Sequence, residues 1–317
     1  MIVSPKILSV IVPLFNEEDS IDHFLQVIIP ILESIASKYT ILWNILAVDD
    51  GSTDHTAQKI RRWVQQNPHV QGLVLSRNFG KEAALTAGLA HADADAVIVI
   101  DVDMQDPPSI MEEMVRHWLD GADMVVGVRS ARENDTRSKR LTSNLYYKLY
   151  NKIAQRPIPA NAGDFRLMSR SVVSAVLQLH ERNRFMKGIF SWVGFKTEYV
   201  YFERAERQHG STKWNYWKLF NFGIDGLTSF STLPLRIWTY VGLLISMFAF
   251  SYGIWIIFRT LFFGEVVKGF PTIMVTILFL GGLQLFSFGI LGEYIGRLYQ
   301  EVKKRPLYII KEKINME

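Results

Sequence analysis

Two aspartates separated by one residue are the clearest chemical signal in this sequence. Asp101 and Asp103 lie in the segment DVDMQDPP, directly after the apolar run VIVI, and Gln105 follows two positions later. Hard divalent cations prefer oxygen ligands, and Mg2+ typically takes one or two carboxylates together with substrate phosphates. We therefore expect these three residues to hold Mg2+ or Mn2+ together with the diphosphate of a nucleotide. The alternative is a solvated turn, which many isolated Asp-x-Asp pairs form.

Other kinds of phosphate or metal chemistry have no support. The sequence contains neither a GxGxxG pattern nor a P-loop, so a bound diphosphate would depend on the cation. This argues against a kinase or a dehydrogenase. The absence of cysteine excludes thiolate metal sites and a cysteine nucleophile. The seven histidines show no spacing typical of metal ligands.

Charged side chains also follow two other apolar runs. Asp49 and Asp50 are expected to bind the base and the ribose, because carboxylates accept hydrogen bonds from ring N–H and hydroxyl groups. Their turn can cap the next helix at the same time, through Ser52 or Thr53. Arg77 and Lys81 are expected to supply positive charge at the nucleotide site. The alternative is that they are solvated residues at the start of a helix.

Short apolar runs that alternate with helical stretches must position these side chains. We predict five strands, over residues 7–13, 43–48, 70–75, 96–100 and 124–128. Continuous apolar strands alternating with helices are typical of an α/β fold whose mostly parallel sheet is covered on both faces. Ligands of such sheets bind beyond the carboxyl ends of the strands, where the polar clusters lie.

The C-terminal third is far more apolar than the rest. Residues 237–258 and 270–292 contain no charged side chain before Glu293, and about 20 apolar residues suffice to cross a bilayer as a helix. We expect two transmembrane helices within 236–296, with a pair of buried helices as the alternative. By the positive-inside rule the basic tail, 297–317, would be cytoplasmic.

These patterns predict a domain organisation in which a catalytic domain is docked to a membrane. We expect a cytoplasmic catalytic domain over residues 1–212 and an interfacial amphipathic segment over 213–235, in a multi-pass protein of the inner or plasma membrane. The segment 213–235 could instead be an ordinary core helix. Gly281, Gly282 and Gly289 offer small-residue packing faces, and we expect a homo-oligomer, with a tetramer as the specific guess.

Charge is unevenly distributed along the chain. The net charge of +4 is the sum of −10 over residues 1–128, +10 over 129–235 and +4 over 236–317. A total this small does not indicate a nucleic acid partner. The acidic part contains the expected nucleotide and metal site, whereas the basic part suits an anionic acceptor and membrane lipids.

Six segments in order carry a family resemblance: PLFNEE, AVDDGSTDHT, SRNFGKEAAL, DVDMQDPP, NAGDFRLMSR and ERAERQHGSTKWN. Together they resemble the family-2 glycosyltransferases that act on polyprenyl phosphates, above all the bactoprenol (undecaprenyl-phosphate) glucosyltransferases, with dolichol-phosphate mannose synthases as relatives. The resemblance implies a GT-A fold and a metal-dependent, inverting transfer of a hexose from a nucleotide sugar to undecaprenyl or another polyprenyl phosphate. UDP-glucose is the expected donor, with mannose, N-acetylglucosamine or aminoarabinose donors as alternatives.

The resemblance also implies roles for individual residues. The nucleotide sugar is expected to contact Pro13, Asn16, Glu17, Asp49, Asp101 and Gln208, and the acceptor phosphate Arg129, Lys139, Arg140, Ser143 and Lys213. Asp164 falls next to the transferred sugar, and Arg207 belongs to a segment that closes over the donor. With Asp103, these two residues are the expected catalytic groups.

The chemistry of the acceptor determines which catalytic groups the protein must supply. A phosphate monoester is anionic near neutral pH, so it can attack the anomeric carbon without a strong general base. We expect Asp164 to orient sugar hydroxyls or support positive charge on the sugar, the alternative being an ion pair with Arg166 or Arg170. A processive glycan synthase and a non-catalytic nucleotide sensor are the other functional classes that fit a domain of this kind.

Overall fold

The computed structural model describes residues 5–130, 162–182, 184–203 and 269–316, together with individual positions between 241 and 262. The chain divides into two compact units. The first consists of residues 1–226 and 305–317, and the second of residues 227–304. The expected site residues that can be described all belong to the first unit.

One eight-stranded sheet forms the framework of the first unit. Its strands are β1 (Ile7–Leu14), β2 (Leu42–Asp49), β3 (Val70–Leu75), β4 (Ala96–Val99), β5 (Met124–Arg129), β6 (Ala162–Ser169), β7 (Thr197–Phe202) and β8 (Ile310–Ile314). Their order across the sheet is β7-β5-β6-β4-β1-β2-β3-β8. The four strands β4, β1, β2 and β3 are neighbours and run parallel to one another.

Two strands run against this parallel block. β6 lies between β4 and β5 and is antiparallel to both, whereas β5 and β7 pair in parallel. β8 pairs antiparallel with β3 at the far edge. The sheet is therefore mixed and mostly parallel, as expected for the GT-A arrangement.

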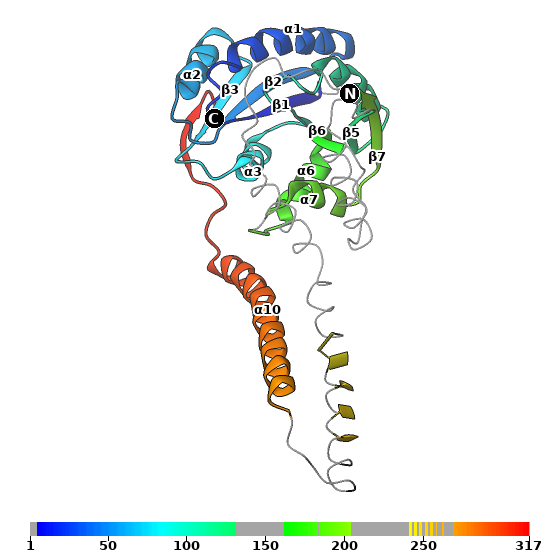
Figure 1. Cartoon of the computed structure of the whole chain (residues 1–317). Helices are drawn as coiled ribbons and strands as arrows, with labels where there is room; N and C mark the ends of the chain where they lie inside the picture. The colour runs from blue at the N-terminus through cyan, green and yellow to red at the C-terminus, as the bar shows by residue number, and fades with distance from the viewer. Residues whose placement is uncertain are drawn as a thin grey trace. The chain divides into compact units, whose positions relative to one another are not determined.

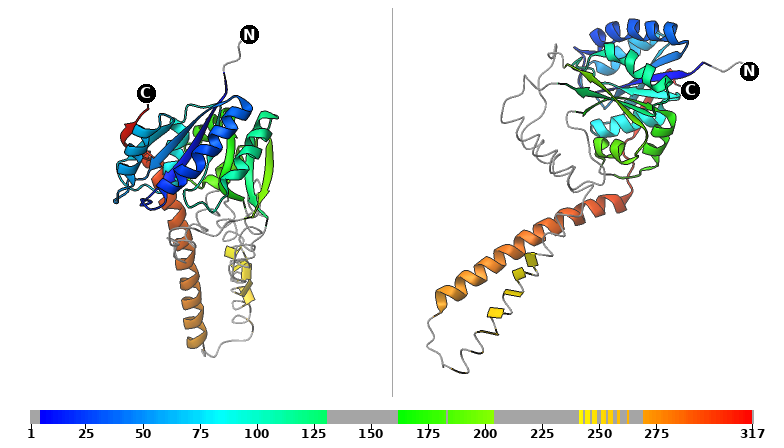
Figure 2. Two further views of the ribbon diagram at one scale, coloured as in Figure 1. Left: turned by 90° about the horizontal axis from the view of Figure 1, so that it is seen from above. Right: turned by 90° about the vertical axis from the view of Figure 1, so that its right-hand side faces the viewer.

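Helices cover both faces of the sheet (Figures 1 and 2). They are α1 (Ile21–Tyr39), α2 (Thr56–Gln66), α3 (Lys81–His91), α4 (Met111–Leu119), α6 (Arg170–Gln178) and α7 (Met186–Trp192), with a 3-10 turn over Pro108–Ile110. Buried side chains of α1, α2 and α4 share one core with β1 and β2, while α3 and α6 pack on the opposite face, against β1, β2, β4 and β6.

The periodicity of α1 explains why it covers the core. Its buried residues recur every three or four positions, which places them on one stripe of the helix: Ile21, Phe24, Leu25, Ile28, Leu32 and Ile35. α3 differs, because seven consecutive residues from Ala83 to Leu89 are buried. Small residues allow this close packing; a Cβ added to Gly88 would approach Ile11 Cγ2 to 2.5 Å.

The five predicted strands are confirmed, with boundaries that differ by one residue. The predicted capping of α2 by Ser52 or Thr53 is wrong, because the helix begins at Thr56. Asp54 accepts the Thr56 N–H instead, at 3.0 Å. Ser52 is occupied elsewhere: its hydroxyl donates to the Asp49 carboxylate and accepts the Asn16 N–H.

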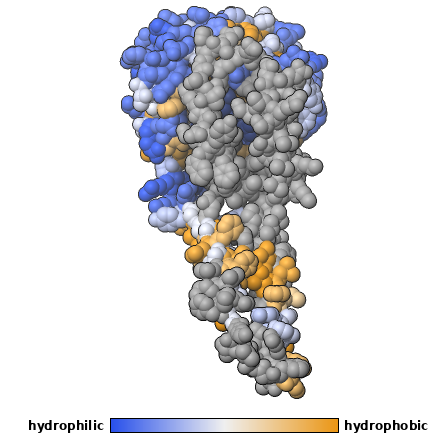
Figure 3. Space-filling model, viewed as in Figure 1, coloured by the Kyte–Doolittle hydropathy of each residue, from blue (hydrophilic) through white to orange (hydrophobic). Residues whose placement is uncertain are grey.

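The second unit contains α10 (Phe270–Lys303), a single helix of 34 residues. Figure 3 shows hydrophobic surface on the described residues of this unit. The exposed apolar side chains of α10 include Leu285, Phe286 and Phe288. Among the residues that the structure describes, no helix meets the combined length and apolarity needed to span a membrane. This finding contradicts the expected multi-pass membrane localisation, and the expected transmembrane pair is not confirmed.

Candidate functional site

The parallel strands bring four polar segments to one edge of the sheet. β1, β2, β3 and β4 are adjacent and parallel, so their carboxyl ends meet at that edge. Asp49 is the last residue of β2, and Asn16, Arg77 and Asp101 follow the ends of β1, β3 and β4. Pro13 lies within β1 opposite Val48 of β2, just before the same edge.

The antiparallel strand β6 adds Asp164 to this edge. In the β4–β6 ladder Val99 pairs with Arg166, and each step forward along β4 corresponds to one step back along β6. Continuing this register by two residues places Asp101 opposite Asp164. A strand that enters the sheet antiparallel starts where its neighbour ends, and Asp164 stands near the start of β6.

Lys81 joins these two carboxylates. Its Nζ lies 2.7 Å from Asp101 Oδ1 and 2.8 Å from Asp101 Oδ2, and 2.7 Å from Asp164 Oδ2. The ion pair of Asp164 is thus made with Lys81, whereas Arg166 donates to the backbone carbonyls of Gly163 and Asp164 and Arg170 to that of Ala92. The alternative pairing of Asp164 with Arg166 or Arg170 is therefore not what the structure contains.

Electrostatics keep this cluster charged. Burial favours the neutral form of Asp164, but the charges of Lys81 and Lys187 outweigh it and hold the pKa of Asp164 well below its usual range. Burial likewise opposes the charge on Lys81, yet Asp101 and Asp164 raise the pKa of Lys81. The cluster therefore presents an ionised carboxylate and an ammonium at neutral pH.

Asp49 and Asp50 are buried and hold loops. Asp50 accepts the N–H groups of Phe79 and Gly80, both at 2.8 Å, and so fixes the entry to α3. Asp49 accepts the backbone N–H of Ser52 at 3.1 Å. Burial raises the pKa of both carboxyl groups. Both carboxylates therefore have a structural use in holding loops, but neither caps α2, which begins at Thr56.

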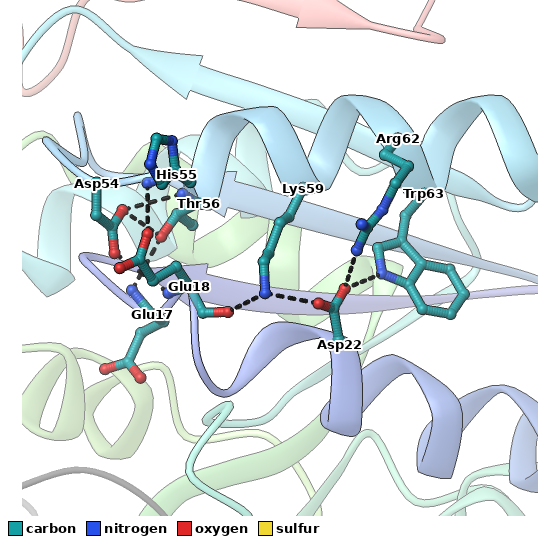
Figure 4. Close-up of polar contacts among 9 residues, drawn as sticks. All are labelled: Glu17, Glu18, Asp22, Asp54, His55, Thr56, Lys59, Arg62 and Trp63. Atoms are coloured by element: carbon teal, nitrogen blue, oxygen red, sulfur yellow. Dashed lines mark hydrogen bonds and ion pairs between the residues drawn. The ribbon is translucent and has the colours of Figure 1, made fainter.

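The loop after β1 is fastened to the start of α2. Asn16 has a positive φ of 52°, and its Oδ1 accepts the Thr53 N–H at 2.9 Å. Figure 4 shows the next contacts: the Glu17 N–H donates to Thr56 Oγ1, and the His55 N–H donates to the Glu18 carboxylate.

Further along the same face, Asp22 of α1 accepts hydrogen bonds from three α2 side chains, those of Lys59, Arg62 and Trp63, at 2.6–2.7 Å (Figure 4). These contacts fix the Asn16–Glu17 loop between two helices.

The Asp-x-Asp segment turns sharply after β4. Met104 has a positive φ of 56°, and the Gln105 N–H donates to Asp103 Oδ1 at 3.2 Å. The following Asp106 is buried and its Oδ1 lies 3.4 Å from the guanidinium of Arg129. Arg129, expected to bind the acceptor phosphate, therefore already has a carboxylate partner near the site.

Two further charged residues lie around the cluster: Glu82, which sequence reasoning missed, and Arg166, which it considered only as a partner of Asp164. Glu82 follows Lys81, and burial, reinforced by the charge of Asp164, raises its pKa to about 8. Arg166 stacks on Phe190, with its guanidinium carbon 4.1 Å from the ring centroid, and burial lowers the pKa of Arg166 to about 10. No local pattern marks Glu82, because the charge of Asp164, which helps to raise its pKa, comes from a strand far away in the sequence.

The remaining predicted residues lie outside the described part of the chain. They are Lys139, Arg140, Ser143, Arg207, Gln208 and Lys213. Arg77, in contrast, is described: it is exposed, lies over the Phe79 ring at 4.0 Å and donates to the Asn78 carbonyl at 2.8 Å. The structure thus brings together Lys81, Asp101 and Asp164.

Comparison with known proteins defines the class to which this fold and site belong. The family described as glycosyl transferase family 2 matches residues 9–177, more than half of the chain. The chain belongs to this family and is a glycosyltransferase. A second family description, the GtrB C-terminal hairpin, matches residues 233–298.

Similar proteins narrow this class. A prophage bactoprenol glucosyl transferase homolog of Escherichia coli is 51% identical over 304 residues, covering 96% of this chain and 98% of its own. The bactoprenol glucosyl transferase of Shigella phage SfII is 51% identical over 305 residues, covering 96% and 97%. A glycosyltransferase of Synechocystis is 46% identical over 310 residues, covering 98% and 96%.

Among solved structures, glucosyl-3-phosphoglycerate synthase from Mycobacterium tuberculosis, in complex with Mn2+, UDP-glucose and phosphoglyceric acid, superposes with a TM-score of 0.44. It is 20% identical and covers 69% of this chain and 76% of its own.

Proposed function

We propose that this glycosyltransferase moves glucose from UDP-glucose to undecaprenyl phosphate or a similar polyprenyl phosphate. The observation that supports it most strongly is the identity of about half of all residues, over nearly the whole chain, with bactoprenol glucosyl transferases. The cluster of Lys81, Asp101 and Asp164 supports it as well, because such a reaction needs balanced charge where two anions meet. The homo-oligomer stays a prediction.

A divalent cation fits the donors at the end of β4. Both oxygens of Asp101 already bind a cationic group, the Lys81 ammonium, so this carboxylate faces a position where positive charge is stabilised. Among the described residues no group of three or more acidic, histidine or cysteine side chains could hold a metal. Asp101 and Asp103, with Gln105, would therefore bind Mg2+ or Mn2+ weakly by themselves and would need oxygens of the donor to complete its coordination.

When bound, such a cation would offset the charge that develops on the leaving nucleoside diphosphate. The chain's own side chains supply the rest. Asp164, ionised and fixed by Lys81, orients sugar hydroxyls and stabilises positive charge on the sugar. Asp49 and the Asn16–Glu17 loop line the nucleoside. Arg129 contributes positive charge toward the acceptor phosphate.

Transfer of label from UDP-[14C]glucose to extractable lipid, with undecaprenyl phosphate as acceptor, tests the function. We expect label in the lipid fraction with the wild-type chain and a loss of at least about 100-fold with Asp103→Ala. Label in an insoluble polymer would instead support a processive synthase. No transfer from any nucleotide sugar would support the non-catalytic alternative, and full activity in excess chelator would contradict the cation.

A further inference from the structure

The position of Lys81 is not explained by the helix that carries it. Lys81 is the first residue of α3, after Gly80 with its positive φ of 100°. A positive charge is unfavourable at a helix N-terminus, because the helix dipole already places partial positive charge there. The two carboxylates that Lys81 contacts, from β6 and from the loop after β4, offset this cost. Some function of those carboxylates therefore has to account for the lysine.

The contact with Asp101 occupies the same oxygens that a cation would need. The ammonium lies within 2.8 Å of both Oδ1 and Oδ2. Two cations cannot both bind these oxygens at full strength, because their positive charges would repel each other at this short distance. Binding of Mg2+ or Mn2+ through Asp101 therefore competes with Lys81.

Lys81 is able to leave. Its side chain is 39% exposed and that of Asp101 is 36% exposed, so the pair opens toward solvent, while Asp164 is only 20% exposed. A lysine side chain is long and flexible and binds phosphate as a point charge. A diphosphate that arrives at this edge would offer new anionic oxygens in place of Asp101.

We propose that Lys81 stands in for the metal in the donor-free enzyme: it neutralises Asp101 and Asp164 and then moves from Asp101 to the diphosphate when donor and cation bind. This inference rests on the proposed function, because it assumes a nucleoside diphosphate donor. Lys81 then couples binding of the metal to binding of the donor, because the Asp101 carboxylate becomes available only when Lys81 contacts the diphosphate instead.

The inference predicts effects of opposite sign on two ligands. Without nucleotide, Lys81→Met should bind Mn2+ about 5-fold more tightly than the wild type, since a competing partly exposed ion pair of about 1 kcal/mol is removed. At saturating Mn2+, the same variant should bind UDP at least about 10-fold more weakly, since a charged hydrogen bond to phosphate is lost. A lysine that only supports the fold would weaken both.

Electron paramagnetic resonance of free Mn2+ measures the first affinity, and titration calorimetry with UDP measures the second, both on the full chain. Lys81→Gln serves as a second neutral variant and should change both affinities in the same directions. Lys81→Arg keeps the charge and should stay close to the wild type in Mn2+ affinity. Lys38→Met is the matched control, since Lys38 pairs with the exposed Glu112 and should change neither.

Unchanged or weaker Mn2+ binding in both neutral variants, or unchanged UDP binding, would overturn the inference. Neither titration involves acceptor lipid or a sugar. Opposite shifts without any glucose transfer would therefore reject the proposed function alone, and glucose transfer without the Mn2+ shift would reject this inference alone.

Discussion

At the scale of single residues, two neighbouring carboxyl groups in different protonation states are the main chemical feature. Asp164 is held ionised by Lys81 and Lys187, whereas burial and the charge of Asp164 raise the pKa of Glu82 to about 8. Environments that push the pKa values of two nearby groups apart assign them different tasks. We assign substrate contact to Asp164 and a neutral supporting position to Glu82.

Replacing Asp164 by asparagine tests the first assignment. Asp164→Asn keeps the shape but removes the charge, and we expect the transfer rate to fall about 100-fold or more, as is typical when one group that stabilises transition-state charge is lost. The rate of lipid labelling measures this. Asp120→Asn, at an exposed position beyond α4, is the control and should be neutral. Near-normal activity of Asp164→Asn would remove Asp164 from the mechanism.

Glu82 should make stability depend on pH. Its folded-state pKa of about 8 exceeds the ordinary value of 4.5, so the native state binds the proton more tightly than the unfolded chain. Stability from this group is present below about pH 4.5 and is lost as the pH rises through about 8. Glu82→Gln stays neutral, so its Tm should match the wild type at pH 5 and exceed it by about 2 °C or more at pH 9. A constant difference across this range would contradict the assignment.

At the scale of elements, the loops after β2 and β3 are locked together. Asp50 binds the Phe79 and Gly80 N–H groups, and a Cβ added to Gly51 would lie 2.3 Å from the backbone carbonyl carbon of Arg77. Gly51 also has a φ of +68°. The close approach and the backbone conformation both require glycine, because neither the Arg77 backbone nor the turn can shift without breaking the Asp50 contacts.

Gly51→Ala should therefore destabilise the fold by about 2–4 kcal/mol, through overpacking against backbone and strain at positive φ. Urea unfolding measures the free energy of unfolding. Gly121→Ala is the matched control, since Gly121 has a φ of +94° but nothing within 4 Å of an added Cβ, and should cost only about 1 kcal/mol. Equal losses in the two variants would show that the approach to Arg77 is unimportant.

At the scale of the whole molecule, the end of the chain closes the sheet of the first unit. β8 pairs with β3, the Ser76 N–H donates to the Ile309 carbonyl at 2.8 Å, and Glu312 binds Arg61 through both oxygens at 2.6 and 3.1 Å. Ile314 packs against the core. β8 therefore covers the edge of β3, so that β3 cannot pair with another chain.

Ending the chain after residue 308 should expose β3. We expect a loss of at least about 2 kcal/mol of unfolding free energy, from lost hydrogen bonds and apolar burial, together with association at higher protein concentration. Urea unfolding and sedimentation measure the two effects. Glu312→Gln, which removes only a partly exposed ion pair, should cost about 1 kcal/mol or less. An unchanged truncated chain would mean that β8 contributes nothing to the edge.

Much of the first unit could be predicted from local pattern. Hydrophobic periodicity and turn chemistry are local properties, so the sequence alone predicts the five strands through Val128. The start of α2 was not predicted correctly, because Asn16, Asp49 and Ser52 form a network across two loops. Hydrogen bonds between distant loops leave no periodic signal in the sequence.

The sequence by itself determined the family, the parallel block of strands and the edge where polar residues collect. Only the tertiary structure decided that β6 enters antiparallel beside β4, so that Asp164 comes opposite Asp101 and Lys81 bridges them. The physical reason is that strand pairing depends on contacts between segments far apart in the chain. The membrane localisation was expected from composition alone, and it is contradicted because no helix among the described residues is long and apolar enough to span a membrane.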